Sequence, residues 1–384
     1  MNVLVFSIGR LDWNIWKPIL QVLKKRKINY NLVISSLHLS KKYGSSYKQI
    51  IKDGYKIFKK IKINFKSSNA KNISKQFSNY SKAFSDILSN RKYDFIFLVG
   101  DRIESLALAS TSIPFKIPIV HFHGGEISEG SYDDLNRHAI SKISHMHCVA
   151  NEIFKKRLIQ MGEEKWRISV VDAPGIDFLK KSKKLSLSTL CKRFKLEKNK
   201  EIIIFNFNSE SLNPKIFNKG MSNIMKVLEK LKDYNVIITG TNYDLYSDFL
   251  NRKLKKSAKK FKHLKFIKSL GNDYPSLLNY SKILIGNSSS GIIESCTFKI
   301  PTINIGNRQN GRLQSKNIIN TNYLKKNILS AIKKAESKSF NDKLKTIKNL
   351  YGEGHFQRKF TNFLLKLKKL NKQQLINKKF IDLN

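Results

Sequence analysis

The chain has 384 residues, of which 41% are hydrophobic, and its formal net charge is +45 at pH 7. This length and composition suit two globular domains of ordinary size. Lys, Asn and Ile are abundant along the whole chain, so we interpret the charge as a solvated surface produced by codon bias. We therefore expect no nucleic-acid partner, although residues 253–268 form a dense basic patch.

Cysteine usage and the amino terminus favour a reduced, cytoplasmic protein. The cysteines lie far apart without metal-ligand spacing, so neither a disulfide framework nor a metal site is expected at Cys148, Cys191 and Cys296. The apolar run from Val3 to Ile8 has no basic region before it, which predicts a first β-strand and not a signal peptide. No apolar run approaches the length needed to span a bilayer, so we expect no membrane partner.

Short β-branched segments alternate with longer amphipathic segments, an order typical of parallel α/β sheets. The first set of predicted strands comprises residues 2–9, 30–35, 62–65, 94–100, 118–123, 146–150 and 168–171. After a charged stretch at 180–200, the second set comprises residues 201–207, 235–239, 263–267, 282–285 and 302–305. The pattern predicts two doubly wound, Rossmann-like domains, at 1–178 and 179–360, and a Lys-rich helical tail at 361–384.

In such sheets ligands bind beyond the carboxyl ends of the strands, so we expect a substrate cleft between the domains. Charged residues gather at these ends in the first domain. The candidates are Asp101, Arg102, His121, His123, Glu126, Asp133, Asp134, Arg137 and His138. Each one alone has an ordinary explanation as a helix cap, a solvated turn or a core histidine. Their coincidence at adjacent strand ends predicts one shared active site.

The segment from Gly286 to Glu294 is the most informative stretch of the second domain. It follows a predicted strand and opens into helix-like sequence, which directs backbone N–H groups at an anion. Three consecutive hydroxyls and two glycines allow a phosphate to approach closely, and Glu294 can accept hydrogen bonds from ribose hydroxyls. The segment indicates a sugar nucleotide, although Ser and Asn also cap ordinary helices.

Together with further motifs, these segments resemble the hydrolysing UDP-N-acetylglucosamine 2-epimerases of sialic-acid and related nonulosonic-acid biosynthesis. The resemblance extends from about residue 2 to residue 320. It rests on Arg10 with Asp12, Gly100-Asp101-Arg102, the segment from His121 to Glu126, Asp133 with Arg137-His138, and residues 157–163, 286–294 and 303–312. It implies the GT-B fold, in which two Rossmann-like domains face a central cleft. It also implies a UDP-sugar substrate, no cofactor and a homo-oligomeric state.

The resemblance assigns roles to individual residues. The implied catalytic residues are Asp101, Glu126, Asp133 and the residue at position 208, Asn208. The implied substrate contacts are Arg10, Arg102, His123, Arg137, His138, Asn242, Ser288, Ser289, Ser290, Gly291, Glu294, Arg308 and Arg312. The implied reaction converts UDP-N-acetylglucosamine or a 2,4-diacetamido-6-deoxy relative to the free 2-epimer and UDP by elimination and hydration. Carboxylates can move the C2 proton, and guanidiniums can stabilise the departing diphosphate.

Two positions depart from the family pattern. After the strand at 201–207 the family usually has a His-Pro pair, whose histidine acts as an acid/base or phosphate partner, but this chain has Asn208-Ser209. Asparagine cannot transfer a proton near neutral pH, which leaves slow turnover, a related substrate or reliance on Glu210 as alternatives. Asp172 stands where a glycine is common, which predicts a change only in the interdomain hinge.

Two other classes of function stay open. A GT-B glycosyltransferase would share the fold and the UDP contacts, but it would transfer the sugar to an acceptor, so release of free hexosamine without an acceptor separates the two. A non-catalytic UDP-sugar-binding protein would need no carboxylate cluster. Loss of all function on Asp101→Asn would therefore argue against it.

Overall fold

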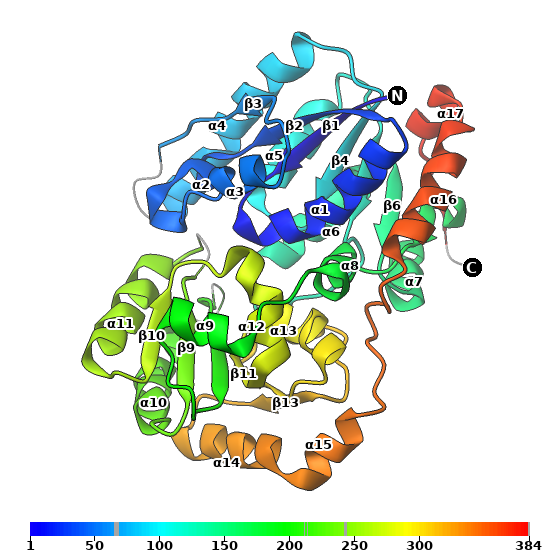
Figure 1. Cartoon of the computed structure of the whole chain (residues 1–384). Helices are drawn as coiled ribbons and strands as arrows, with labels where there is room; N and C mark the ends of the chain where they lie inside the picture. Colours follow the sequence, from blue (N-terminus) through cyan, green and yellow to red (C-terminus); the bar gives the residue numbers. More distant parts are fainter. Residues whose placement is uncertain (65–68, 211, 213, 242–243, 383–384) are drawn as a thin grey trace.

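The computed structural model describes residues 1–64, 69–210, 212, 214–241 and 244–382 (Figure 1). Within these residues the strands form two sheets, with the orders β3-β2-β1-β4-β5-β6-β7 and β10-β9-β8-β11-β12-β13. Every pairing between neighbouring strands is parallel. The predicted class, two doubly wound α/β domains, is therefore confirmed.

The first sheet and its flanking helices form the first domain. Its strands are β1 (Asn2–Ser7), β2 (Asn29–Ile34), β3 (Lys59–Lys60), β4 (Phe95–Val99), β5 (Ile119–Phe122), β6 (Met146–Val149) and β7 (Ile168–Val170). Its helices are α1 (Arg10–Lys25), α2 (Ser36–Leu39), α3 (Tyr47–Lys52), α4 (Ala70–Ser89), α5 (Ile103–Ser112), α6 (Asp133–Ile143) and α7 (Glu152–Gln160). The helix α8 (Pro174–Lys181) follows β7 and packs against α1.

The second sheet and its flanking helices form the second domain. Its strands are β8 (Ile202–Asn206), β9 (Asn235–Thr239), β10 (Leu264–Ile267), β11 (Ser281–Gly286), β12 (Thr302–Ile305) and β13 (Ile318–Thr321). Its helices are α9 (Leu187–Phe194), α10 (Pro214–Lys230), α11 (Ser247–Lys260), α12 (Tyr274–Tyr280), α13 (Ser289–Ile293), α14 (Lys325–Glu336) and α15 (Lys338–Leu344). The last helices are α16 (Phe356–Lys368) and α17 (Lys372–Ile376).

The alternation of side chains along each strand builds a core on both faces of the sheet. In β1, Val3 and Val5 pack with α1 and α16, whereas Leu4 and Phe6 pack with α4 and α5 on the opposite face. All four side chains are buried. Because both faces are covered, the strands read as nearly continuous apolar runs, which is why their positions can be predicted from the sequence.

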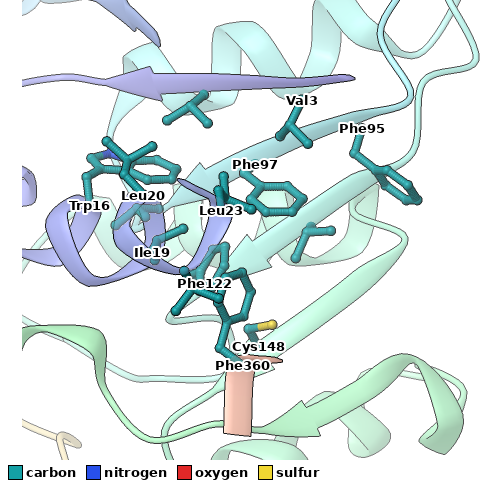
Figure 2. Close-up of a cluster of buried hydrophobic side chains, with 14 of the residues drawn as sticks. Val3, Trp16, Ile19, Leu20, Leu23, Phe95, Phe97, Phe122, Cys148 and Phe360 are labelled. Carbon is teal, nitrogen blue, oxygen red and sulfur yellow. The ribbon is translucent and has the colours of Figure 1, made fainter. Parts of the chain in front are cut away.

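The carboxyl-terminal helices return to the first domain. Figure 1 shows α16 and α17 beside the first sheet, and Figure 2 shows Phe360 of α16 among the aromatic side chains of that sheet. The ring centroid of Phe360 lies 5.4 Å from that of Phe122 and 6.2 Å from that of Phe97. The predicted tail at 361–384 contains the end of α16 and the whole of α17, and the division of the chain at residues 178 and 360 stays a prediction.

One predicted strand is wrong, and two elements were not predicted. The third strand is β3 and not residues 62–65, because Ile63 donates its N–H to the Ser36 hydroxyl and not to a neighbouring strand. The strand β13 was not predicted, because its sequence is half polar and only partly buried. The charged stretch at 180–200 contains α9, which buries Leu190 and Cys191. Within the described residues, no helix is long and apolar enough to cross a membrane.

Candidate active site

A cavity of about 280 Å³ lies between the two domains, at the carboxyl ends of the strands. Residues that follow β1, β4 and β5 line it from the first domain, and residues that follow β8, β9, β10, β11 and β12 line it from the second. This is the position predicted for a ligand of doubly wound sheets.

Asp101 stands directly after β4 and faces a guanidinium on α6. Arg137 donates from Nη2 to Asp101 Oδ2 and from Nη1 to Asp134 Oδ1 at 2.8 Å. Removal from solvent alone would raise the pKa of Asp101, but Arg137 and Arg312 hold it below its ordinary value. Asp101 is therefore a carboxylate at neutral pH.

Glu126 is a second ionised carboxylate, and it is 2% exposed. Its Oε1 lies 2.7 Å from Nδ1 of His123, and its Oε2 accepts a hydrogen bond from Arg312 of the second domain. Burial alone would raise the pKa of Glu126, but Arg312 and His123 lower it to about 2. The Nε2 atom of His123 is buried without a hydrogen-bond partner among the described residues, and His123 lines the cavity.

Asp133, at the first turn of α6, differs from Asp101 and Glu126, because its surroundings raise its pKa and do not lower it. Burial, followed by the charges of Asp101 and Asp244, raises the pKa of Asp133 to about 7. Its Oδ2 accepts a hydrogen bond from the Ser131 hydroxyl at 3.1 Å. On the first-domain side, the site thus combines the ionised carboxylates of Asp101 and Glu126 with Asp133, whose carboxyl can gain or lose a proton near neutral pH.

The second-domain wall is built from the turn between β11 and α13. Ser288, Ser289 and Ser290 line the cavity, and the Ser288 hydroxyl accepts the N–H of Ser290 at 3.4 Å. The helix that follows has only five residues, so its dipole is weaker than the sequence suggested. Arg308 lines the same wall and donates from Nη1 to the Asn287 carbonyl at 3.3 Å.

Glu294 lines the cavity just beyond α13. Its Oε2 atom is buried without a hydrogen-bond partner among the described residues. Burial raises the pKa of Glu294 to about 7, although Tyr274 partly offsets this effect. A buried carboxyl oxygen that faces a cavity suits a ligand hydroxyl, because leaving it unsatisfied is unfavourable.

Asn208 follows β8 and lines the cavity, and its backbone makes two hydrogen bonds with one neighbouring side chain. Its N–H donates to Oδ1 of Asn287 at 2.7 Å, and its carbonyl accepts Nδ2 of Asn287 at 2.9 Å. Glu210 does not line the cavity. Its Oε1 accepts the backbone N–H groups of Asn307 and Arg308, at 2.8 and 3.1 Å. Glu210 therefore positions the loop that carries Arg308.

Guanidiniums join the two domains around the cavity. Arg10, from the first domain, donates to the backbone carbonyls of Lys268 and Gly240 in the second. Burial lowers the pKa of Arg10 to about 10, so it stays cationic at neutral pH. Arg102 donates from Nη1 to Asp244 Oδ1 at 3.0 Å. Together with the hydrogen bond from Arg312 to Glu126, these contacts join the two domains around the cavity.

Most of the predicted site residues line this one cavity. They are Arg10, Asp101, Arg102, His123, Glu126, Asp133, Arg137, Asn208, Ser288, Ser289, Ser290, Glu294, Arg308 and Arg312. His138 and Gly291 are not among its lining residues. His138 lies toward Asp134, with 3.5 Å between Nε2 and Oδ2, because five residues of helix turn it away from the face of Asp133. Asn242 lies outside the described residues.

The cavity also contains residues that the sequence did not single out, such as Tyr274, Gln309 and Asn206. Asn206 is the last residue of β8, and Tyr274 and Gln309 lie in the segments after β10 and β12, but none of the three has a charge to mark it. His121, by contrast, is buried in the first domain, with Nε2 at 2.7 Å from the Gly100 carbonyl and Nδ1 at 3.1 Å from the Ser141 hydroxyl. Burial lowers the pKa of His121 to about 3, so it acts as a neutral structural residue.

Comparison with known proteins gives consistent matches. Residues 21–365 match the family model described as UDP-N-acetylglucosamine 2-epimerase. The GDP/UDP-N,N'-diacetylbacillosamine 2-epimerase (hydrolyzing) of Campylobacter jejuni is 36% identical over 385 residues, which cover 100% of this chain and 99% of that protein. The UDP-N,N'-diacetylbacillosamine 2-epimerase (hydrolyzing) of Legionella pneumophila is 30% identical over 354 residues, which cover 90% of each protein.

A solved structure gives the same fold. The crystal structure of UDP-GlcNAc 2-epimerase from Neisseria meningitidis, bound to UDP-GlcNAc, superimposes with a TM-score of 0.79 at 18% sequence identity. The match covers 95% of this chain and 100% of that one. The predicted GT-B arrangement of two Rossmann-like domains is thereby confirmed.

Proposed function

The chain belongs to the UDP-N-acetylglucosamine 2-epimerase family, and we propose that it is a hydrolysing 2-epimerase of a UDP-N-acetylhexosamine. The reaction would consume one water and release UDP and the free 2-epimeric sugar. The observation that carries the proposal is the meeting of two kinds of residue in one cavity. The cavity is lined from the first domain by Asp101, Glu126 and Asp133. It is lined from the second domain by the turn at Ser288 to Ser290 and by Arg308.

We propose that UDP binds along the second-domain wall. The hydroxyls of Ser288 to Ser290 would donate to the diphosphate, and the planar guanidinium of Arg308 would compensate the charge of the diphosphate. Glu294 would accept hydrogen bonds from the ribose hydroxyls, which fits its buried Oε2 atom, since no described residue is its hydrogen-bond partner. The sugar would then extend toward the carboxyl groups of the first domain.

The electrostatics support separate roles for the three carboxyl groups. Abstraction of the weakly acidic C2 proton needs a base, and a group with a pKa near the working pH serves best. Asp133, with a pKa raised to about 7, would take this proton. The C1–O bond would then break, with its electron pair leaving on UDP. Water would add across the resulting double bond, its OH to C1 and its proton to C2 on the face opposite Asp133, which gives the 2-epimer. Asp101 and Glu126 would stay ionised and orient the sugar and the water.

The substrate is proposed from the relatives. The names of the Campylobacter and Legionella proteins both specify diacetylbacillosamine, a 2,4-diacetamido-6-deoxy sugar. The apolar side chains of Ile8, Leu37 and Val99 line the first-domain part of the cavity, where extra methyl groups would be favoured over hydroxyls. We therefore propose the UDP-linked diacetamido sugar as the preferred substrate over UDP-N-acetylglucosamine, and nonulosonic-acid biosynthesis as the pathway.

Turnover of each UDP-sugar in deuterium oxide, followed by NMR, tests the proposal. We expect UDP and a free 2-epimeric sugar that carries deuterium at C2, formed without any acceptor. Asp133→Asn should lower the yield of this product by about 100-fold or more, whereas Asp86→Asn, which changes an exposed carboxylate of α4, should not. A product without deuterium at C2 would exclude the elimination route, and a requirement for an acceptor would favour a glycosyltransferase. The homo-oligomeric state stays a prediction that light scattering can measure.

A further inference from the structure

Lys378 occupies an unusual position for a residue of a Lys-rich tail. Its side chain is only 14% exposed. Its Nζ atom donates to the carbonyls of Lys142 and Ser144 at 2.6 and 2.7 Å, and it lies 3.4 Å from the carbonyl of Ser141. These carbonyls belong to the carboxyl-terminal end of α6, where the last carbonyls lack partners within the helix and a cation is favoured.

The ammonium group is also paired. Nζ of Lys378 lies 2.6 Å from Glu163 Oε2, and this carboxylate is fully buried. Glu163 is held in turn by Nε2 of His147 at 3.0 Å and by Nζ of Lys142 at 3.1 Å. Burial lowers the pKa of Lys378 to about 8, an effect that Glu163 partly offsets. A buried cation in this position satisfies several backbone acceptors at once.

The rest of the tail is fixed by specific contacts and not by charge alone. Arg167, which is fully buried, donates to the carbonyls of Gln374, Leu375 and Asn377 at 3.1, 2.9 and 3.0 Å. The N–H of Ile381 donates to the carbonyl of Gly162 at 3.1 Å. The tail is therefore docked on the first domain by hydrogen bonds on both sides of Lys378.

The helix that Lys378 caps is the one that carries part of the active site. Asp133 and Arg137 both lie on α6, and Arg137 binds Asp101. At the other end of α6, the Ser141 hydroxyl contacts His121, whose Nε2 lies 2.7 Å from the carbonyl of Gly100. A displacement of α6 would thus move Asp133 directly, and it would also disturb the turn that carries Asp101.

We propose that Lys378 is a positioning residue, and that the docked carboxyl-terminal tail sets the placement of α6 and thereby of Asp133 and Asp101. The proposal rests on the proposed function, because it concerns the first-domain side of the same active site. It assigns a role in turnover to residues that lie outside the cavity and outside the second domain. UDP binding, which uses the second-domain wall, should be independent of it.

Three variants test this role. Lys378→Met removes the ammonium group, Lys378→Arg keeps a cation, and Lys379→Met changes the exposed neighbour as a matched control. We expect Lys378→Met to lower kcat by at least about 10-fold while its Kd for UDP stays within about 2-fold, because the second domain is untouched. Lys378→Arg should recover most of kcat, and Lys379→Met should match the wild type. Amide hydrogen exchange in α6 should become faster in Lys378→Met alone.

Each other outcome overturns the proposal. Unchanged kcat and unchanged α6 exchange in folded Lys378→Met would show that the tail does not position the site. A parallel loss of kcat and UDP affinity would show a general structural defect. If Lys378→Met does not fold, Lys378→Gln takes its place, and failure of both to fold would make the residue one of stability only. If the wild type shows no turnover, the proposed function fails, and hydrogen exchange alone still tests the contact between the tail and α6.

Discussion

The ion pair between Arg312 and Glu126 joins the two domains inside the cavity, and its removal gives a measurable prediction. The two side chains are 5% and 2% exposed. Removal of Arg312 leaves a buried carboxylate without its main compensating charge, which typically destabilises a protein by about 3–5 kcal/mol. The lowering of the pKa of Glu126 from 4.5 to about 2 corresponds to a similar value, roughly 3 kcal/mol. We therefore expect Arg312→Met to destabilise the first domain by about 3 kcal/mol.

Urea unfolding at pH 7, followed by tryptophan fluorescence, measures this change. The three tryptophans report on the first domain, since Trp13, Trp16 and Trp166 all pack in its core. Lys155→Met serves as the control, because its ion pair with Glu152 lies on α7 of the same domain, with side chains 21% and 66% exposed, and should contribute less than about 1 kcal/mol.

The double variant Arg312→Met with Glu126→Gln separates charge from packing. Because a neutral Gln needs no counter-charge, we expect the double variant to be more stable than Arg312→Met alone. Free-energy changes that add within about 0.5 kcal/mol would refute the proposed coupling.

The pH dependence of stability should follow the sign of the shift. The pKa of Glu126 is lower in the folded protein than in the unfolded chain, so the stabilisation is complete above about 4.5 and is lost as the pH falls through about 2. In Arg312→Met this part of the acid dependence should be largely missing. An acid unfolding curve with the wild-type slope between pH 4.5 and 2 would contradict this assignment.

Further variants address the ligand and the chemistry. Arg308→Ala should weaken UDP binding by about 2 kcal/mol in calorimetry, while the exposed control Arg358→Ala should not; equal affinities would remove Arg308 from the site. Glu294, whose pKa is raised to about 7, becomes a better acceptor as the pH rises, so the preference for UDP over 2′-deoxy-UDP should grow from pH 6 to pH 8, and this pH dependence should vanish in Glu294→Gln. Asp133→Asn should lower turnover by about 100-fold or more and remove a limb near pH 7 from the rate profile; a retained limb would point to another group. Asn208→His should raise turnover or add a histidine-like limb, and an unchanged profile would show that no acid or base acts at this position.

The sequence predicted those parts of the molecule that depend on local patterns. Nearly continuous apolar runs gave the positions of strands such as β1 and β4, because both faces of these strands are buried. Charged residues at the ends of such runs gave the candidate site, because parallel strands bring their carboxyl ends to one edge of a sheet. The position of Asp101 follows from these two rules alone.

The parts that could not be predicted depend on partners far away in the chain. Arg10 binds the carbonyls of Lys268 and Gly240, more than 200 residues later. Every residue has a backbone carbonyl, so the sequence does not show which carbonyls Arg10 will meet. The docking of α16 on the first sheet and the burial of Lys378 are equally long-range. In the sequence, Lys378 is indistinguishable from the many exposed lysines around it.

Asp172 shows how a departure from a family pattern acquires a physical meaning. Its φ of 66° lies in the left-handed region, which explains why a glycine is common there. The chain holds Asp172 in this conformation through its carboxylate, whose Oδ1 lies 2.5 Å from Nζ of Lys359 and whose Oδ2 accepts the N–H groups of Glu353 and His355 at 3.4 and 3.3 Å. These contacts fix the segment that leads into α16.

The other departure, Asn208, is different in kind, because Asn287 holds both polar groups of its backbone. Asn287 holds the backbone of residue 208 through both its N–H and its carbonyl. Asn287 also accepts hydrogen bonds on its own carbonyl from Arg308 and Gln309. The same residue thus ties the strand end that carries position 208 to the loop that faces the proposed diphosphate site. A change from histidine to asparagine at position 208 therefore alters which protons the site can move, while the framework that holds the residue stays in place.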